Sequence, residues 1–221
     1  MNTVFLDRTS VTDSTSRAKD LALIAVFAAI VAASVAVPGI PLGGVGVPIT
    51  LQTFAVLLTG MVLGGPRAFA AVCLYVLLGL AGVPIFSMGR AGLGVLAGPS
   101  AGYIIAFPFA AALAGFFASY VLRRGLTPRV LWLFACGILS SILLIHTLGS
   151  LGIAINTKAT LGQAFLSDLV FYPGDVIKNI LAAVVATALH RAFPDVLVQP
   201  SLRKSKQHRN GENARLAQDA Q

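Results

Sequence analysis

The chain has 221 residues, of which 57% are hydrophobic and only 11% are charged. A soluble domain carries roughly a quarter charged residues, so this composition excludes an ordinary soluble protein. Only two acidic residues, Asp168 and Asp175, lie between Leu21 and Pro194. A stretch this apolar cannot keep a surface in contact with water, and we expect lipid to be its solvent.

The net charge of +8 raises the question of nucleic-acid binding. The basic residues instead border the apolar segments, as the positive-inside rule places them, so we expect contact with a lipid bilayer and none with nucleic acid. The run Arg203–Lys206 is typical of a solvated, disordered tail. We divide the chain into a cytoplasmic N-terminal segment (1–19), a membrane domain (20–193) and a basic cytoplasmic tail (194–221).

Six apolar segments follow one another along the chain. The last three reach the ~20 residues that a spanning helix needs. The second and third are shorter and are separated by Gly64-Gly65-Pro66, which predicts a tight turn between antiparallel helices. The sequence therefore predicts an all-α polytopic membrane protein with six transmembrane helices. The segments cover residues 20–37, 50–65, 67–82, 101–122, 129–153 and 169–193.

The distribution of Lys and Arg orients these helices. With a cytoplasmic N-terminus, thirteen of the sixteen basic residues lie on the inner side. Arg90 and Lys158 lie outside, and Lys178 lies within the sixth segment. By the positive-inside rule, both termini are predicted to be cytoplasmic.

The sixth segment carries charged residues near its start. Asp175 and Lys178 are three residues apart, so a helix brings them to one face about a turn apart. Ionisable groups in a spanning segment are energetically unfavourable and usually line a cavity, and Tyr172 and Asn179 add polar atoms beside the pair. We predict that these four residues bind a substrate. The alternative is a structural ion pair that reaches toward water at the helix end.

The connection over residues 82–102 is rich in glycine. It lacks the Gly-Lys-Ser/Thr of a phosphate-binding loop, and Arg90 is its only charged residue. Glycine lets the backbone approach a ligand closely, and a single arginine can hold a carboxylate. We predict a loop that closes over an outward-facing pocket, with Arg90, Phe86 and Tyr103 as substrate-binding residues. An ordinary flexible loop is the alternative.

Alanines recur at four-residue spacing in the first segment, at Ala25, Ala29 and Ala33. Such a stripe lets two helices approach closely, but in an alanine-rich helix it can also arise by chance or serve packing inside this protein.

Two further sets of polar residues stand out in apolar surroundings. Thr50, Gln52 and Thr53 open the second segment, where they either cap the helix or contact a ligand. His146 stands alone in an apolar run, and we expect from it a helix-packing hydrogen bond rather than catalysis.

Four stretches of the sequence together resemble the BioY family, the substrate-specific S-components of energy-coupling-factor (ECF) transporters for biotin. They occur in the family's order and with matching spacing, and the resemblance extends from about residue 21 to residue 192. One departure is Ser100-Ala101, where the family usually has Thr-Gly. The four stretches are Val47–Thr53, Gly79–Phe86, Leu96–Tyr103 and Pro173–Lys178.

The resemblance implies a six-helix, multi-pass protein of the cell membrane that binds biotin at its outer side. It also implies partners, namely a transmembrane coupling protein and two cytoplasmic subunits that hydrolyse ATP, although some members of the family work without them. The stripe Ala25, Ala29 and Ala33 matches the family's docking surface. No cofactor is expected in the chain itself, and the absence of a Walker motif from its sequence indicates that it is not an ATPase.

Biotin has a ureido ring with N–H donors and a carbonyl acceptor, and its tail ends in a carboxylate. If the resemblance holds, Asp175 accepts from the ureido N–H groups, while Lys178 or Arg90 donates to the carbonyl or to the tail. Which cation meets which end stays open. The aromatic residues expected to cover the sulfur-containing ring are Phe86, Tyr103 and Tyr172.

Three other functions remain as alternatives. An S-component for thiamine or riboflavin would hold a larger aromatic ligand, for which we expect more tryptophan than the single Trp132. A metal-dependent membrane enzyme needs clustered carboxylates or histidines, and the membrane region has only two acids. A scaffold without a ligand would leave the Asp175–Lys178 pair with a purely structural role.

Overall fold

The structure is a computed structural model that describes residues 8–36, 39 and 46–194, with residues 8–16 described by their backbone alone. Within these ranges every regular element is a helix and no β-strand is present. The prediction of an all-α fold is confirmed. The predicted basic tail lies outside the described residues from residue 195 onward.

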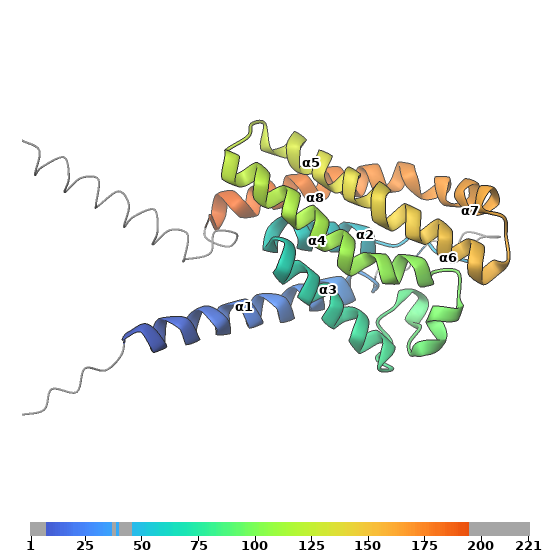
Figure 1. Ribbon diagram of the computed structural model, residues 1–221, viewed down its shortest axis with the longest axis horizontal. Helices are drawn as coiled ribbons and strands as arrows, with labels where there is room; N and C mark the ends of the chain where they lie inside the picture. Colours follow the sequence, from blue (N-terminus) through green and yellow to red (C-terminus); the bar gives the residue numbers. More distant parts are fainter. Residues whose placement is uncertain (1–7, 37–38, 40–45, 195–221) are drawn as a thin grey trace, which may run out of the picture.

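The α-helices of the described residues follow the predicted apolar segments in order (Figure 1). A π-helical segment, Ser141–His146, joins α5 to α6, and a 3₁₀ turn, Leu169–Phe171, joins α7 to α8. Two further 3₁₀ turns, Ser87–Gly89 and Leu93–Ala97, lie in the glycine-rich connection. The α-helices are α1 (Arg8–Ala33), α2 (Gln52–Leu63), α3 (Gly65–Leu80), α4 (Ala101–Arg124), α5 (Arg129–Ser140), α6 (Thr147–Thr157), α7 (Leu161–Asp168) and α8 (Tyr172–Ala192).

Two helix starts differ from the prediction. α1 begins at Arg8, well before residue 20, because a helix can continue past the apolar stretch that hydropathy detects. The last segment begins with α7, where Thr160 and Gln163 form a capping box. Hydropathy places that start at residue 169 instead, since α7 contains polar residues such as Ser167 and Asp168.

The tight turn predicted between the second and third segments is confirmed. Gly64 is the single residue between α2 and α3, and its φ of 77° is a conformation that favours glycine. Pro66 lies in the first turn of α3, where its missing N–H leaves no helical hydrogen bond unmade. The two short helices therefore form an antiparallel hairpin.

α4 lies at the centre of the bundle and packs against α2, α3, α5 and α6. Glycine allows the closest of these contacts. A Cβ at Gly115 would lie 2.6 Å from the backbone nitrogen of Gly65 and 2.8 Å from the backbone oxygen of Gly60. A Cβ at Gly102 would overlap the backbone carbonyl of Leu148 in α6. Backbone contact on both sides thus fixes α4 between the α2–α3 hairpin and α6.

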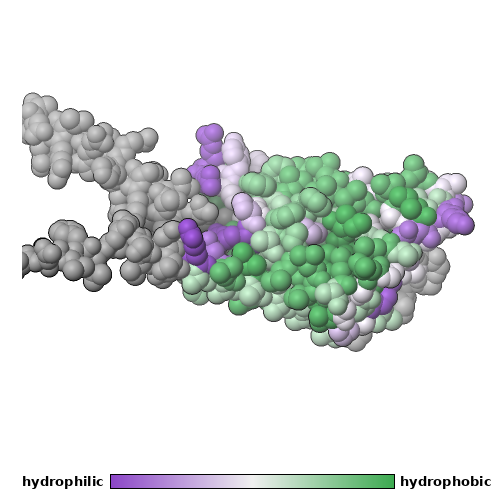
Figure 2. Space-filling model, turned by 60° about the horizontal axis from the view of Figure 1, so that its bottom comes forward, coloured by the Kyte–Doolittle hydropathy of each residue, from purple (hydrophilic) through white to green (hydrophobic). Residues whose placement is uncertain are grey.

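Three helical stretches of the described residues are long and apolar enough to cross a membrane: Ala101–Arg124, Arg129–Thr157 and Leu161–Ala192. Large hydrophobic side chains, among them Phe116 and Leu143, are exposed on the outside of the bundle. Figure 2 shows a hydrophobic band across the middle of one face, with hydrophilic residues at its two ends. Apolar surface of this extent is unfavourable in water and identifies a membrane protein.

The connections between helices gather at two opposite ends of the bundle. In Figure 1 the α2–α3 turn, the α4–α5 connection and the end of α8 lie toward the left. The glycine-rich connection and the α6–α7 connection lie toward the right. Arg67, Arg124 and Arg191 therefore belong to one end, and Arg90 and Lys158 belong to the other.

The close approach of α4 to the α2–α3 turn predicts the effect of a single methyl group. Gly115→Ala should destabilise the protein by about 1–3 kcal/mol, because the new side chain overlaps backbone that cannot move aside easily. The melting temperature of the purified protein in detergent measures this loss. Gly162→Ala in α7 is a matched control, since a Cβ there meets no atom within 4 Å. Equal melting temperatures for Gly115→Ala and the wild type would contradict the packing of α4.

Candidate ligand-binding site

A pocket lies between the first turns of α2, α4 and α8, at the end of the bundle that carries the glycine-rich connection. Its cavity volume is about 40 Å³, far below the roughly 300–1,000 Å³ typical of small-molecule sites. The space is narrow, so a vitamin-sized ligand must displace some lining side chains. The lining residues are Val47, Pro48, Thr50, Gln52, Thr53, Ser87, Ser100, Tyr103, Ile104, Phe107, Phe171, Asp175 and Lys178.

Asp175 and Lys178 form an ion pair on one face of α8, at the spacing that the sequence indicates. Nζ of Lys178 lies 2.7 Å from Oδ1 of Asp175. Thr53, at the start of α2, donates to the same oxygen at 2.9 Å and accepts from Lys178 at 3.3 Å. Asp175 is 5% exposed and Lys178 9%, so both charges are largely removed from water and depend on partners. Both also line the pocket, where they can meet a ligand.

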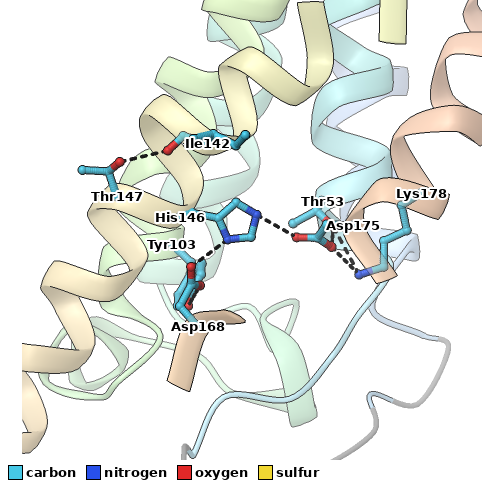
Figure 3. A network of polar contacts seen from close by, with 8 residues as sticks. All are labelled: Thr53, Tyr103, Ile142, His146, Thr147, Asp168, Asp175 and Lys178. Atoms are coloured by element: carbon cyan, nitrogen blue, oxygen red, sulfur yellow. Dashed lines mark hydrogen bonds and ion pairs between the residues drawn. The ribbon is translucent and has the colours of Figure 1, made fainter. Parts of the chain in front are cut away.

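His146 links this pair to a second buried carboxylate. Its Nε2 lies 3.5 Å from Oδ2 of Asp175, and its Nδ1 lies 2.9 Å from Oδ2 of Asp168. Asp168 also accepts a hydrogen bond of 2.5 Å from the hydroxyl of Tyr103. Figure 3 shows the resulting chain of contacts from Lys178 to Tyr103. The predicted helix-packing hydrogen bond from His146 is confirmed, and it makes His146 part of the site.

Local helix geometry brings these groups together. The π-helical segment ends at His146, and just after it the Thr147 hydroxyl donates to the carbonyl oxygen of Ile142, five residues back, at 2.9 Å. π-Helical segments are rare in proteins as a whole, but those that do occur often lie at functional sites. Asp168 and Asp175 are seven residues apart on the nearly continuous helix α7–α8, about two turns, so both point toward one side.

Aromatic rings surround the polar network. Tyr103 lies in the pocket wall and packs edge-on against Phe171, with ring centroids 5.9 Å apart. Tyr172 stacks on the imidazole of His146 with centroids 4.1 Å apart. Of the two predicted tyrosines, Tyr103 is therefore placed to touch a ligand, whereas Tyr172 holds His146.

Two of the predicted substrate-binding residues lie in the protein core. Phe86 is 1% exposed and packs edge-on against Tyr75, with centroids 5.7 Å apart. Asn179 is fully buried where α8 meets α5, against Gly137. The amide atoms of Asn179 have no hydrogen-bond partner among the described residues. Neither side chain belongs to the pocket wall.

Arg90 lies beside the rim of the pocket. It is half-buried, and its guanidinium donates to the backbone oxygen and to the hydroxyl of Ser87, at 3.2 Å each. Ser87 itself lines the pocket. Asn156 of α6 anchors the glycine-rich connection by donating to the carbonyls of Leu96 and Gly98 at 3.1 and 2.6 Å. The connection is thus held against the bundle next to the pocket.

The three polar residues at the start of α2 divide into two roles. Gln52 donates to the hydroxyl of Tyr75 at 2.6 Å, which donates to the carbonyl of Ile85 at 3.1 Å. Thr50 donates to the Gln52 side-chain oxygen at 3.0 Å. Thr50 and Gln52 therefore fasten α2 to α3 and to the glycine-rich connection, while Thr53 joins the ion pair in the pocket.

The alanine stripe of α1 faces outward. Ala25, Ala29 and Ala33 are exposed, whereas Phe27 and Val31 between them are buried against the bundle. Packing of the stripe inside the described part of this chain is therefore excluded. The exposed face is available to lipid or to a partner.

Sequence reasoning left Asp168 and His146 out of the predicted site. A signal for Asp168 was present, because it and Asp175 are the only acids between residues 21 and 194 and their spacing places them on one helical face. The position of His146 between them depends on how α6 packs against α7 and α8. No local pattern in the sequence encodes that contact.

The all-helical bundle and the buried ion pair in the wall of a narrow pocket define an integral membrane protein with a candidate ligand-binding site. The sequence pattern of the BioY family matches residues 8–195. Because the match covers most of the chain, the chain belongs to the BioY family.

Individual relatives agree with this assignment. The biotin transporter BioY of Rhizobium etli is 36% identical over 178 residues, which cover 80% of this chain and 95% of that protein. The probable biotin transporter BioY of Bacillus subtilis is 38% identical over 174 residues, covering 79% and 91%. The crystal structure of the S-component for biotin from an ECF-type ABC transporter is similar with a TM-score of 0.75 at 29% identity, covering 80% of this chain and 93% of that one.

Proposed function

We propose that this chain is the substrate-binding membrane subunit of a biotin uptake system. The observation that carries the proposal is the Asp175–Lys178 ion pair in the wall of the pocket between α2, α4 and α8. The same fold occurs in an S-component for biotin, and relatives over most of the chain are biotin transporters. In this proposal the chain binds and delivers its ligand and catalyses no reaction.

The ion pair matches the ureido ring of biotin, which presents N–H donors directly beside a carbonyl acceptor. Asp175 would accept from an N–H group, and Lys178, 2.7 Å from Asp175, would donate to the adjacent carbonyl. Charge-assisted hydrogen bonds of this kind are about twice as strong as neutral ones. Thr53, already bonded to both charged groups, would keep them in register when the ligand arrives.

The remaining lining fits the rest of the molecule. Tyr103, Phe107 and Phe171 supply an apolar wall for the sulfur-containing ring. Ser100 has a buried hydroxyl without a hydrogen-bond partner among the described residues, and it would bond to the ligand. Arg90 beside the rim would exchange its contacts with Ser87 for the tail carboxylate.

We further propose six membrane spans with both termini in the cytoplasm. Six helical units connect the two ends of the bundle when α5–α6 and α7–α8 are each counted as one (Figure 1). Support comes from the basic residues, because Arg67, Arg124 and Arg191 lie at one end, and the positive-inside rule assigns that end to the cytoplasm. The pocket, near Arg90, would then open to the outside of the cell membrane.

The energy for uptake would come from partner subunits. We propose a transmembrane coupling protein and two subunits that hydrolyse ATP, with the coupling protein seated on the exposed stripe Ala25, Ala29 and Ala33. Small residues allow the close helix contact that such docking requires.

The binding proposal predicts a specific ligand and a specific loss. Purified protein should bind radiolabelled biotin, which unlabelled biotin displaces and thiamine or riboflavin does not. Asp175→Asn should lower the affinity at least tenfold, a loss of roughly 1.5–3 kcal/mol, because a charged acceptor is removed from a site shielded from water. Equilibrium binding assays in detergent measure both results.

Two further variants make this test decisive. Asp20→Asn is the matched control, since Asp20 pairs with Arg67 at 3.1 Å away from the pocket, and it should bind biotin as the wild type does. The double variant Asp175→Asn/Lys178→Met should bind weakly. If it binds biotin normally, the ion pair is structural and the proposed contact is wrong.

The proposed topology predicts which positions an impermeant thiol reagent can label from outside. In a background with Cys73 and Cys136 replaced by serine, cysteines at Met88 and Lys158 should react in intact cells. A cysteine at Thr127, in the α4–α5 connection, should react only after permeabilisation. Labelling of position 127 in intact cells would overturn the orientation.

The docking proposal predicts separable effects on binding and on uptake. Ala29→Leu should block close approach of a partner helix, so co-purification of the coupling protein and ATP-driven uptake should fall while biotin binding to the isolated chain persists. Ala188→Leu, at an exposed alanine of α8, is the matched control and should leave all three unchanged. Normal co-purification of the Ala29→Leu protein would mean that the stripe faces lipid.

A further inference from the structure

Both ring nitrogens of His146 face carboxylate oxygens. Nδ1 lies 2.9 Å from Asp168 and Nε2 lies 3.5 Å from Asp175. A neutral imidazole has one N–H and one lone pair, so it would direct a lone pair at one of the two carboxylates. An imidazolium, with two N–H groups, donates to both.

The two carboxylates are themselves arranged as acceptors. Oδ1 of Asp168 accepts from the hydroxyl of Tyr103, and Oδ1 of Asp175 accepts from the ammonium of Lys178. Their Oδ2 atoms both face His146. Each carboxylate thus has one oxygen bonded to a donor and the other facing a ring nitrogen of His146. This arrangement fits two ionised aspartates when both ring nitrogens carry protons.

Charge balance then requires one more proton in the cluster, carried either by His146 as an imidazolium or by one of the carboxylates. Asp168 is 0% exposed, Asp175 5% and His146 4%, and Lys178 offsets only one of the two negative charges. A buried charge without a partner is strongly unfavourable. Protonation of His146 makes the cluster neutral. The titratable groups packed around His146 in the described residues are Asp168 of α7, Asp175 and Tyr172 of α8 and, through Asp168, Tyr103 of α4.

The surrounding structure holds the imidazole in this position. The π-helical segment that ends at His146 directs the side chain between α7 and α8. Tyr172 stacks on the ring with an interplanar angle of 29°, a contact that favours a cationic partner over an aromatic face. His146 itself is absent from the pocket wall, so it would act on a ligand only through Asp175.

We propose that His146 is a positioning residue that stays an imidazolium between the two buried aspartates and keeps Asp175 ionised and directed into the pocket. The consequence for ligand rests on the proposed function, because Asp175 is the acceptor assigned to biotin. Without the charge on His146, the cluster keeps one negative charge in excess. Biotin affinity should therefore fall when that charge is removed.

Nitrogen NMR of the ligand-free protein, isotope-labelled at histidine, tests the charge directly. The sequence has three histidines, His146, His190 and His208, and glutamine variants of each assign the signals. We expect two protonated ring nitrogens in His146 at neutral pH. One protonated and one bare nitrogen would overturn the proposal.

Biotin binding to variants that remove the charges of this cluster tests the positioning role. His146→Gln keeps the side chain polar, but glutamine cannot carry a charge. The biotin affinity of this variant should be at least about tenfold lower than that of the wild type. Adding Asp168→Asn removes the excess negative charge, so the affinity of His146→Gln/Asp168→Asn should recover to within about threefold of the wild type. A merely structural role for His146 predicts that the second substitution weakens binding further.

His190→Gln is the matched control. His190 is also a buried histidine, but its Nε2 contacts the backbone oxygen of Met61 at 2.8 Å, away from the pocket. The biotin affinity of His190→Gln should therefore match that of the wild type. Wild-type affinity in His146→Gln, or a double variant no tighter than His146→Gln, would refute the positioning role. An imidazolium at His146 together with no biotin binding by the wild type would uphold the charge state and reject biotin as the ligand.

Discussion

The burial of two carboxylates inside an apolar bundle is the constraint on which the site depends. An unpaired charge at membrane depth is unfavourable by several kcal/mol, so Asp168 and Asp175 can be kept only if donors surround them. No single helix can supply those donors. They come from α2, α4, α8 and the π-helical segment before α6, in the form of Thr53, Tyr103, Lys178 and His146.

Close helix packing makes this convergence possible. Hydrogen bonds tolerate only small changes in distance, so the helices that carry donors and acceptors must be fixed to one another. A Cβ at Gly149 would overlap the ring of Tyr103, and Gly102 meets the backbone of Gly152. These glycines bind nothing themselves. They bring α4 and α6 into backbone contact, as small residues commonly do between membrane helices, and so set the position of Tyr103 beside Asp168.

The sequence predicts the features of this protein that are local. Hydropathy locates the helices, Gly64 and Pro66 mark the turn, and three-residue spacing pairs Asp175 with Lys178. Features that depend on tertiary packing are beyond such patterns. Asn179 follows Lys178 directly, yet one residue turns a helix by about 100°, and this directs Asn179 into a helix contact. The burial of Phe86 and the bridging position of His146 likewise follow from how separate elements meet.

We propose ligand binding at one end of the bundle and partner docking on the outer face of α1. The central proposal is that biotin binds at Asp175 and Lys178. The most direct test is an experimental structure of the protein with biotin bound. We expect the ureido ring to lie within hydrogen-bonding distance of both residues, with His146 still between Asp168 and Asp175. If biotin binds elsewhere, for example in the cavity between α1 and α8, and makes no contact with Asp175 or Lys178, the proposed binding site is wrong.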